Sequence, residues 1–388
     1  MGGSVALRLA SALALLLLMT PSAAVGVEDT TEAACRLPLD VDVDGGGKSW
    51  RLATGVRASL ISATHASSGA DLSKVPIGIV RIKPGADRLA PLLSPMPRTM
   101  SPDRHFTNSR VVALTNADFF ASLTPSRAVP AGTVVRSGQV LFWSGTRSPS
   151  LAVDESGVPR TVRIDVHARL QSGDDSMAVS SVNDPRTSEH VVSAFTDAWR
   201  AAVPLGTRTG VVLRDDRVVR VVTNGKPVKF AKGEAVVLVP KGRETPQVGS
   251  PAILSVVPTA KDGKAVVHAT GHAGRVMRAG RINAPCSAYE LIHRPRTTFA
   301  WNDEGVTWII VAGTDVPDDA AGLRSGGATK WQMADLARRL GATWAVSMDG
   351  GGSSSLLIKT PRTLRRLDNS PDAWLRPLPV AWAVLASR

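Results

Sequence analysis

Residues 329–358, TKWQMADLARRLGATWAVSMDGGGSSSLLI, contain the pattern that decides the fold. Thr329 and Gln332 have the spacing of a helix capping box, in which each residue bonds the backbone N–H of the other. One apolar stripe then recurs at helical spacing, at Met333, Leu336, Ala337 and Leu340. Gly341 follows where a left-handed helix cap is common. The stretch predicts a helix, a turn and then a strand over 344–348.

Another apolar run, 308–312, precedes this helix, so the sequence predicts a strand-helix-strand unit near residues 308–348. Most other segments are short apolar or alternating runs separated by Gly or Pro, which is typical of strands and turns. The runs on either side of 136–139 and of 214–217 predict two hairpins. We therefore expect an α+β fold that is β-rich, with mixed sheets and few helices.

The composition indicates a globular chain with basic surfaces. Of the 388 residues, 43% are hydrophobic, and the formal net charge is +13. Such a charge attracts anionic partners. The Lys and Arg residues are dispersed, and we find neither zinc-finger spacing nor an aromatic nucleic-acid motif, so we expect no nucleic-acid partner. A phosphorylated or otherwise anionic glycan is the more natural partner for an exported protein, and simple solubility is the alternative reason for the charge.

Residues 1–24 have the features of a signal peptide: Arg8, a short apolar run over 9–19, and the small pair Ala23-Ala24. A membrane anchor needs roughly 20 apolar residues, which this run does not reach. We expect a secreted or extracytoplasmic protein without stable membrane insertion after cleavage. In that setting Cys35 and Cys286 would form a disulfide, although two separate thiols are the alternative.

The turn from Asp349 to Ser355, DGGGSSS, is the strongest candidate for a site. Its glycines let the backbone approach a ligand closely, and successive N–H groups in such a turn can bind an anion. Asp349 adds a carboxylate directly after a predicted strand. An ordinary flexible turn is the alternative.

A second candidate is the segment 116–120, NADFF, which also follows an apolar run. Here Asp118 would be a second acid, and Asn116 would donate to a ligand oxygen. A turn with two core phenylalanines explains the same residues. In the segment 293–298, HRPRTT, Arg296 could present a planar fork to a phosphate, or lie in a solvated basic loop.

We expect neither a metal site nor a cofactor. The run from Asp40 to Gly45 starts like a calcium loop, but Arg51 occupies the position where the loop requires Glu. His268 and His272 have zinc-like spacing, but their surroundings predict a strand and a loop instead of the helix that such a site needs.

Taken in order, NADFF at 116–120, GHAG at 271–274, HRPRT at 293–297 and MDGGGSS at 348–354 resemble the phosphodiester glycosidase family. The pair Arg376-Pro377 resembles a late Arg-Pro of that family. The resemblance implies a catalytic domain over 111–388, on which a β-rich segment over 25–110 packs. It implies catalytic roles for Asp349, Asp118 and Arg296. Substrate contacts would come from Asn116, His293, Thr297, Gly350, Gly351, Ser353 and Ser354.

The sequence departs from the family pattern in three places. Where the family begins the helix with a Gly-Met-Thr-like segment, residues 327–329 are Gly-Ala-Thr. Thr298, Phe299 and Ala300 follow the Arg-Thr pair, where the family has a small residue and then Gly. The loop over 271–274 replaces a glycine-rich loop that ends in Pro. Because these departures affect sugar specificity, we predict only the class of substrate. This class is a glycan in which a sugar is linked through a phosphate diester.

The chemistry of the leaving group is consistent with this class of substrate. An ordinary glycosidase protonates a departing alkoxide, whereas a phosphate ester departs without that help. What the departing phosphate needs is stabilisation of its charge, which an Arg fork can supply. We therefore expect an exported glycosidase, that is, a hydrolase of sugar-1-phosphate diesters. The alternatives are a hydrolase of a non-phosphorylated glycan and a non-catalytic exopolysaccharide-binding or assembly protein.

Overall fold

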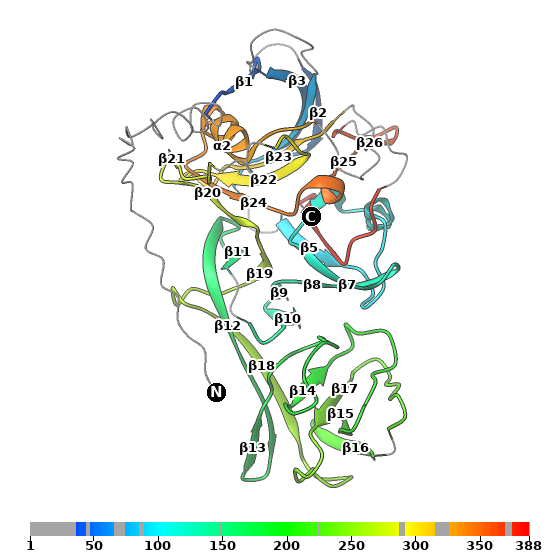
Figure 1. Ribbon diagram of the computed structural model, residues 1–388. Coiled ribbons are helices and arrows are strands. Elements are labelled where there is room, and N and C mark those ends of the chain that lie inside the picture. Colours follow the sequence, from blue (N-terminus) through cyan, green and yellow to red (C-terminus); the bar gives the residue numbers. More distant parts are fainter. Residues whose placement is uncertain are drawn as a thin grey trace, which may run out of the picture.

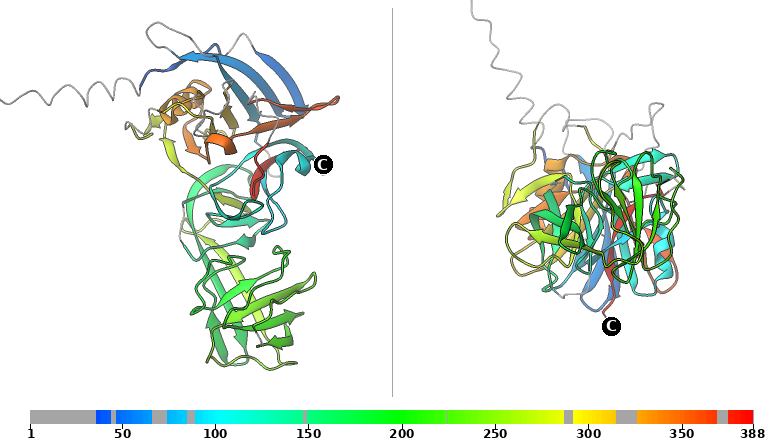
Figure 2. Two further views of the ribbon diagram at one scale, coloured as in Figure 1. Left: turned by 45° about the vertical axis from the view of Figure 1, so that its right-hand side comes forward. Right: turned by 90° about the horizontal axis from the view of Figure 1, so that it is seen from below.

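The computed structural model describes residues 36–43, 47–65, 74–84, 89–146, 149–223, 225–286, 292–314, 326–368 and 375–387. Within these ranges the molecule is elongated and built mainly of strands (Figure 1). A large curved sheet and the helix α2 form one end, and a lobe made of residues 159–260, here called the distal lobe, forms the other (Figure 2).

Two sheets in the upper part carry the strands that matter most for function. The larger one runs in the order β1 (Leu39–Asp40), β3 (Val56–His65), β4 (Val75–Ile82), β23 (Thr307–Ala312), β22 (Arg296–Trp301), β24 (Trp344–Ser347), β20 (Gly274–Arg278) and β21 (Arg281–Ile282), with β2 (Lys48–Ala53) paired to β3. The second sheet runs β26 (Leu364–Arg366), β25 (Leu356–Lys359), β6 (Val111–Asn116), β27 (Val380–Leu385) and β5 (Leu89–Leu93).

The remaining strands connect these sheets to the distal lobe and build it. One sheet runs β10 (Gln139–Phe142), β9 (Val134–Arg136), β19 (His268–Gly271), β11 (Pro149–Val153), β12 (Pro159–Ser172) and β13 (Asp175–Ala178), with β18 (Ile253–Ala260) paired to β12. Another runs β14 (Ser193–Phe195), β17 (Glu234–Val239), β15 (Thr209–Arg214) and β16 (Arg217–Val222). A separate hairpin joins β7 (Phe120–Thr124) and β8 (Arg127–Pro130).

Helices are few, as the sequence predicts: the described ones are α2 (Lys330–Arg339) and the 3-10 turns η1 (Pro102–Thr107) and η2 (Gly351–Ser353). The strand-helix-strand unit is confirmed as β23, α2 and β24. Both bonds of the capping box form, with Gln332 N–H donating to Thr329 Oγ1 at 3.1 Å and Thr329 N–H donating to Gln332 Oε1 at 2.9 Å. The apolar stripe of the helix is buried against the large sheet.

The expectation of mixed sheets is wrong for the described strands. Every ladder between named strands is antiparallel. The helical connection does not create a parallel pair, because β22 lies between β23 and β24. The predicted hairpins form as β9–β10 and β15–β16, and the chain is mostly β.

Strands from the N-terminal third are integral to both upper sheets. β4 lies between β3 and β23, and β5 pairs with β27. The core beneath them includes Trp382, which is fully buried, contacts Phe299 at 5.8 Å between ring centroids, and donates its indole N–H to Thr270 Oγ1 at 2.9 Å. Burying such aromatic surface while satisfying the indole N–H stabilises the junction of three sheets.

Two predictions fall outside the described residues: the signal peptide over 1–24, and Cys35 with its expected disulfide to Cys286. Among the described helices, none has the length and apolar character needed to cross a membrane.

Candidate active site

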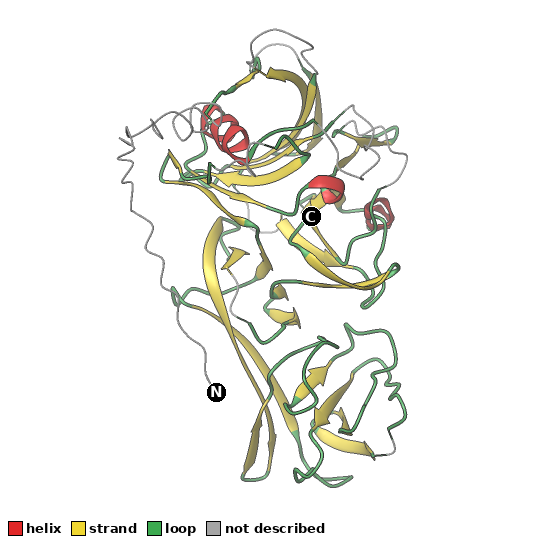
Figure 3. Ribbon diagram, in the orientation of Figure 1, coloured by secondary structure: helices red, strands yellow, loops and turns green. Residues whose placement is uncertain are grey.

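The site lies where three strands end. Asn116 ends β6, Arg296 begins β22, and Asp349 follows β24 by two residues. Backbone bonds hold these ends together: Met348 N–H donates to Thr297 O at 2.9 Å, and Asp349 N–H donates to Ala117 O at 3.1 Å. Figure 3 shows the η2 turn, which follows Asp349, between the large curved sheet and the sheet that contains β5.

The Asn116 side chain bonds to each of the other segments that meet at this junction. Its side-chain N–H donates to Asp349 O at 2.7 Å, and its Oδ1 accepts from the Thr297 hydroxyl at 2.6 Å and from Ser355 N–H at 3.3 Å. Both Asn116 and Thr297 are almost fully buried. Their polar groups are thus bonded to protein partners, so the geometry gives them a role in joining the strand ends, and their predicted substrate contacts stay a prediction.

Asp118 is a nearly buried carboxylate whose pKa is raised to about 6, mainly because burial disfavours its charge. The negative charge of Asp349 raises this pKa further, and Asp349 N–H donates to the carbonyl of Ala117, the residue before Asp118. The N–H groups of Phe119 and Gly132 act in the opposite direction, the first at 2.7 Å from Asp118 Oδ1. A carboxylate with such a pKa changes protonation near neutral pH, as an acid or base catalyst must.

Asp349 has better support for its negative charge. Burial raises the pKa of Asp349 overall, while the Ser353 hydroxyl, the Gly350 N–H at 2.9 Å from Oδ1, and the charge of Arg376 oppose this rise. The two carboxylates are therefore in different environments, with Asp349 the better stabilised as an anion.

Two glycines enclose the Asp118 carboxylate. A Cβ atom added at Gly132 would lie 2.5 Å from Asp118 Oδ2, and one added at Gly271 would overlap the same oxygen. Neither glycine has a left-handed backbone conformation. Side-chain size, and not backbone freedom, is therefore the reason why glycine is needed at both positions.

We predict that Gly271→Ala displaces the Asp118 carboxylate and lowers kcat at least tenfold, while the fold survives because a short side-chain rotation relieves the overlap. The displaced carboxylate would be better hydrated, so its pKa should fall and the acid limb of the pH–rate profile should move to lower pH. Kinetics of a double-mutant cycle with Asp118→Ala provide the check, because the Gly271 effect should vanish without the carboxylate. Equal effects in both backgrounds would contradict it.

Two arginines flank the glycine turn. Arg296 is nearly buried, donates through Nε to Ala328 O at 3.3 Å, and has Nη1 3.7 Å from the position of a Cβ added at Gly350. Arg376 is exposed and donates through Nη1 to Ser353 Oγ at 3.3 Å. Its guanidinium also lies over the Phe120 ring, 5.0 Å from the centroid. Arg376 is absent from the predicted site, although its Arg376-Pro377 pair matches the family pattern.

Most N–H groups of the predicted anion nest are bonded within the protein. Gly350 N–H binds Asp349 Oδ1, Gly351 N–H binds Pro295 O, Ser353 N–H binds Gly350 O, and Ser354 N–H binds Gly351 O. These bonds hold the turn's shape, and the N–H of Gly352 takes part in none of them. The arginines are therefore the main groups available to stabilise negative charge. His293 is half-buried at the entry to β22, and Ser354 Oγ is buried without a hydrogen-bond partner among the described residues.

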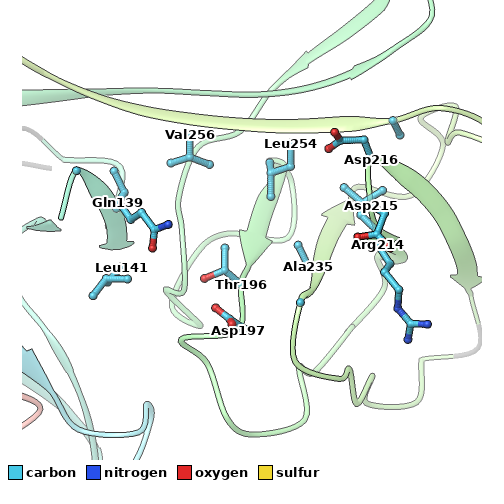
Figure 4. A pocket seen from close by; sticks show the side chains of 15 residues that line it. Gln139, Leu141, Thr196, Asp197, Arg214, Asp215, Asp216, Ala235, Leu254 and Val256 are labelled. Atoms are coloured by element: carbon cyan, nitrogen blue, oxygen red, sulfur yellow. The ribbon is translucent and has the colours of Figure 1, made fainter. Parts of the chain in front are cut away.

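A separate cavity of about 370 Å³ lies by the distal lobe (Figure 4). Its labelled lining includes Asp197, Asp216 and Arg214. It contains none of the predicted site residues. The candidate active site is therefore the junction of Asp118, Asp349 and the two arginines.

Comparison with known proteins shows the family to which the chain belongs. Residues 188–385 match the model of the phosphodiester glycosidase family, which is just over half of the chain. The chain therefore belongs to the phosphodiester glycosidase family. The match contains Gly271, Arg296, Asp349 and Arg376, whereas Asn116 and Asp118 precede it.

Two solved structures with TM-scores above 0.6 share the fold at low identity. A hypothetical protein from Synechocystis has 15% identity and a TM-score of 0.63, covering 91% of this chain and 68% of that one. A candidate exported protein from Burkholderia pseudomallei has 15% identity and a TM-score of 0.66, covering 90% and 98%. The zebrafish N-acetylglucosamine-1-phosphodiester alpha-N-acetylglucosaminidase catalytic domain, auto-inhibited by its pro-peptide, has 11% identity, a TM-score of 0.47 and coverage of 89% of each chain. No curated protein matches the sequence.

Proposed function

We propose that this protein hydrolyses a glycosyl phosphodiester, in which a sugar is joined through its anomeric carbon to a phosphate diester within an anionic glycan. The observation that carries the proposal is the pairing of two nearly buried carboxylates, Asp118 and Asp349, with guanidinium groups beside the turn that follows Asp349. Family membership supports the reaction class.

The different environments of the carboxylates suggest their roles. Asp118, with a pKa of about 6, is ionised at neutral pH yet basic enough to take a proton from water. Asp349, whose negative charge is supported by Gly350, Ser353 and Arg376 against the effect of burial, would stabilise positive charge at the anomeric carbon. Water attacks this carbon and gives its proton to Asp118. The bond from carbon to phosphate oxygen breaks, and its electron pair leaves with the phosphate.

The departing group becomes a phosphomonoester with additional negative charge. Arg296 and Arg376 flank the turn and would stabilise that charge, one from a buried position and the other from the solvent side. A planar guanidinium can bind two phosphate oxygens at once. This arrangement replaces the proton that an ordinary glycosidase supplies to its leaving group.

The test is a substrate comparison between a sugar-1-phosphate diester and the matching glycoside with a neutral leaving group. Release of reducing sugar together with a phosphomonoester supports the proposal. Sugar release from the neutral glycoside alone would favour a hydrolase of non-phosphorylated glycans. Binding of both compounds without turnover would favour a non-catalytic glycan-binding protein.

We predict that Arg296→Lys weakens phosphodiester hydrolysis more than hydrolysis of a neutral glycoside with a comparably good leaving group. Lysine keeps the charge but loses the planar two-donor fork. Parallel kcat/KM measurements on the two substrates check this. Equal losses on both would mean that Arg296 acts through the fold, for example through its bond to Ala328 O.

Export is part of the proposal and rests on the signal-like residues 1–24. Secreted material whose N-terminal sequence starts near Val25 would support it. Mature protein that retains Met1 would contradict it.

A further inference from the structure

Two exposed arginines lie directly opposite each other below the active site. Arg98 and Arg127 form an antiparallel bridge, held by Ala128 N–H to Pro97 O at 2.9 Å and Thr99 N–H to Ser126 O at 3.2 Å. Side chains at such opposed positions share one face, and like charges there destabilise the pair. Among the described residues neither arginine makes an ion pair. This uncompensated pair is suited to an anionic ligand.

A third exposed arginine adjoins this pair. Arg200 N–H donates to Met96 O at 2.6 Å, two residues before Arg98, and the neighbouring Trp199 forms a bridge with Met96. Arg200 also makes no ion pair with a described residue. Three unpaired positive charges are thus brought together by segments that are far apart in the sequence.

The basic surface continues into two shallow hollows of the distal lobe. The first, of about 200 Å³, is lined by Arg200, Lys229 and Phe230. The second, of about 530 Å³, shares Lys229 and Phe230 and adds Arg220, whose Nη2 donates to Lys229 O at 2.7 Å. Acids are present too: Asp197 lines the first hollow, and Glu234 in the second is paired with Arg214. The half-buried Phe230 ring offers an apolar surface between the cations.

One hairpin connects this surface to the active site. Phe120, at the start of β7, lies under the Arg376 guanidinium, and Arg127 begins β8 on the paired strand. Figure 1 shows β7 and β8 between the η2 turn and the distal lobe. Cations therefore extend from the site, along the hairpin, to the hollows. We call Arg98, Arg127, Arg200, Arg220 and Lys229 the basic track.

We propose that the basic track binds the continuing chain of a polyanionic glycan, one with repeated phosphate groups, while the bond to be cleaved lies between Asp118 and Asp349. The inference rests on the proposed function and adds to it that the natural substrate is a polymer and not a single diester. Repeated phosphates would meet successive cations, and sugar rings could contact Phe230.

The experiment measures kinetics on two substrates, a single-linkage sugar-phosphate diester and an oligomer of the same repeating unit. It compares the wild type with the double variant Arg98→Gln/Arg127→Gln. Both residues are exposed, so the fold should be retained. We expect KM for the oligomer to rise about 3- to 10-fold, as loss of two exposed charge contacts implies. We expect kcat/KM for the single diester to stay within about twofold. Higher salt should reduce the wild-type preference for the oligomer.

Lys261→Gln/Lys264→Gln is the matched control, because it removes the same charge from another exposed loop, which packs on β12. The proposal would be rejected if the arginine variant left the KM for the oligomer unchanged. It would also be rejected if the lysine variant changed that KM by the same factor. If no diester is hydrolysed, the proposed function fails separately. The track is then judged by calorimetric binding of the oligomer, which the arginine variant should weaken 3- to 10-fold and the lysine variant should leave unchanged.

Discussion

Asp349→Asn should lower kcat on a glycosyl phosphodiester by on the order of 10² to 10⁴, the usual contribution of a catalytic carboxylate, while leaving the fold intact. The substitution is nearly isosteric. Asparagine Oδ1 can still accept from Gly350 N–H, and the backbone carbonyl can still accept from Asn116. What disappears is the negative charge that faces Arg376.

Turnover and melting temperature measured on the same preparation distinguish catalysis from structure. If Asp349 has only a structural role, the Asp349→Asn variant should have a lower melting temperature, and its activity should fall only in proportion to the loss of folded protein. Near-normal turnover with normal melting would remove Asp349 from the mechanism. Ser353→Ala is a useful comparison, because it removes one hydrogen bond to Asp349 but keeps the charge.

Asp118→Asn should produce a loss of similar size, on the order of 10² to 10⁴ in kcat, because an amide cannot accept a proton from water. In the wild type the rate should fall as the pH decreases through about 6, where Asp118 becomes protonated. The residual rate of the variant should lack this limb. A pH–rate profile of the variant that keeps its limb near pH 6 would assign the titration to another group.

The same substitution should change the pH dependence of stability. The folded pKa of Asp118, about 6, lies above its ordinary value of 3.8. The unfolded chain therefore releases this proton first, and the free energy of unfolding falls as the pH rises from about 4 to about 6. The size is roughly 3 kcal/mol at most. Relative to wild type, Asp118→Asn should become more stable as the pH rises through this window. Denaturant unfolding at several pH values measures the difference.

Local sequence patterns were sufficient for several elements of the fold and site. The capping box at Thr329 and Gln332 and the turn at 349–355 involve neighbours in the chain, so spacing alone identifies them. The two carboxylates could also be proposed, because each follows an apolar strand. Their proximity follows from the junction at Asn116, whose bond to Asp349 O joins residues 233 positions apart.

Other features depend on contacts that no local pattern contains. Gly132 has no unusual backbone conformation, and its role is visible only in the space that it leaves for Asp118. Arg376 reaches Ser353 and Phe120 from a different segment. How many N–H groups of the glycine turn remain available to an anion could not be predicted, because spacing cannot tell which are already bonded, as those of Gly351 and Ser354 are.

The position of β27 has a consequence for how the protein folds during its synthesis. This strand lies between β6 and β5, although it contains residues 380–385. Until residues 380–385 have been synthesised, β6 lacks its pairing with β27, and Asn116 lacks the strand neighbour Ala381. Pairings across such sequence separations form slowly, and an open strand edge invites association with other chains. The active site should therefore assemble only after β27 has been made, and the chain should be prone to association with other chains until then.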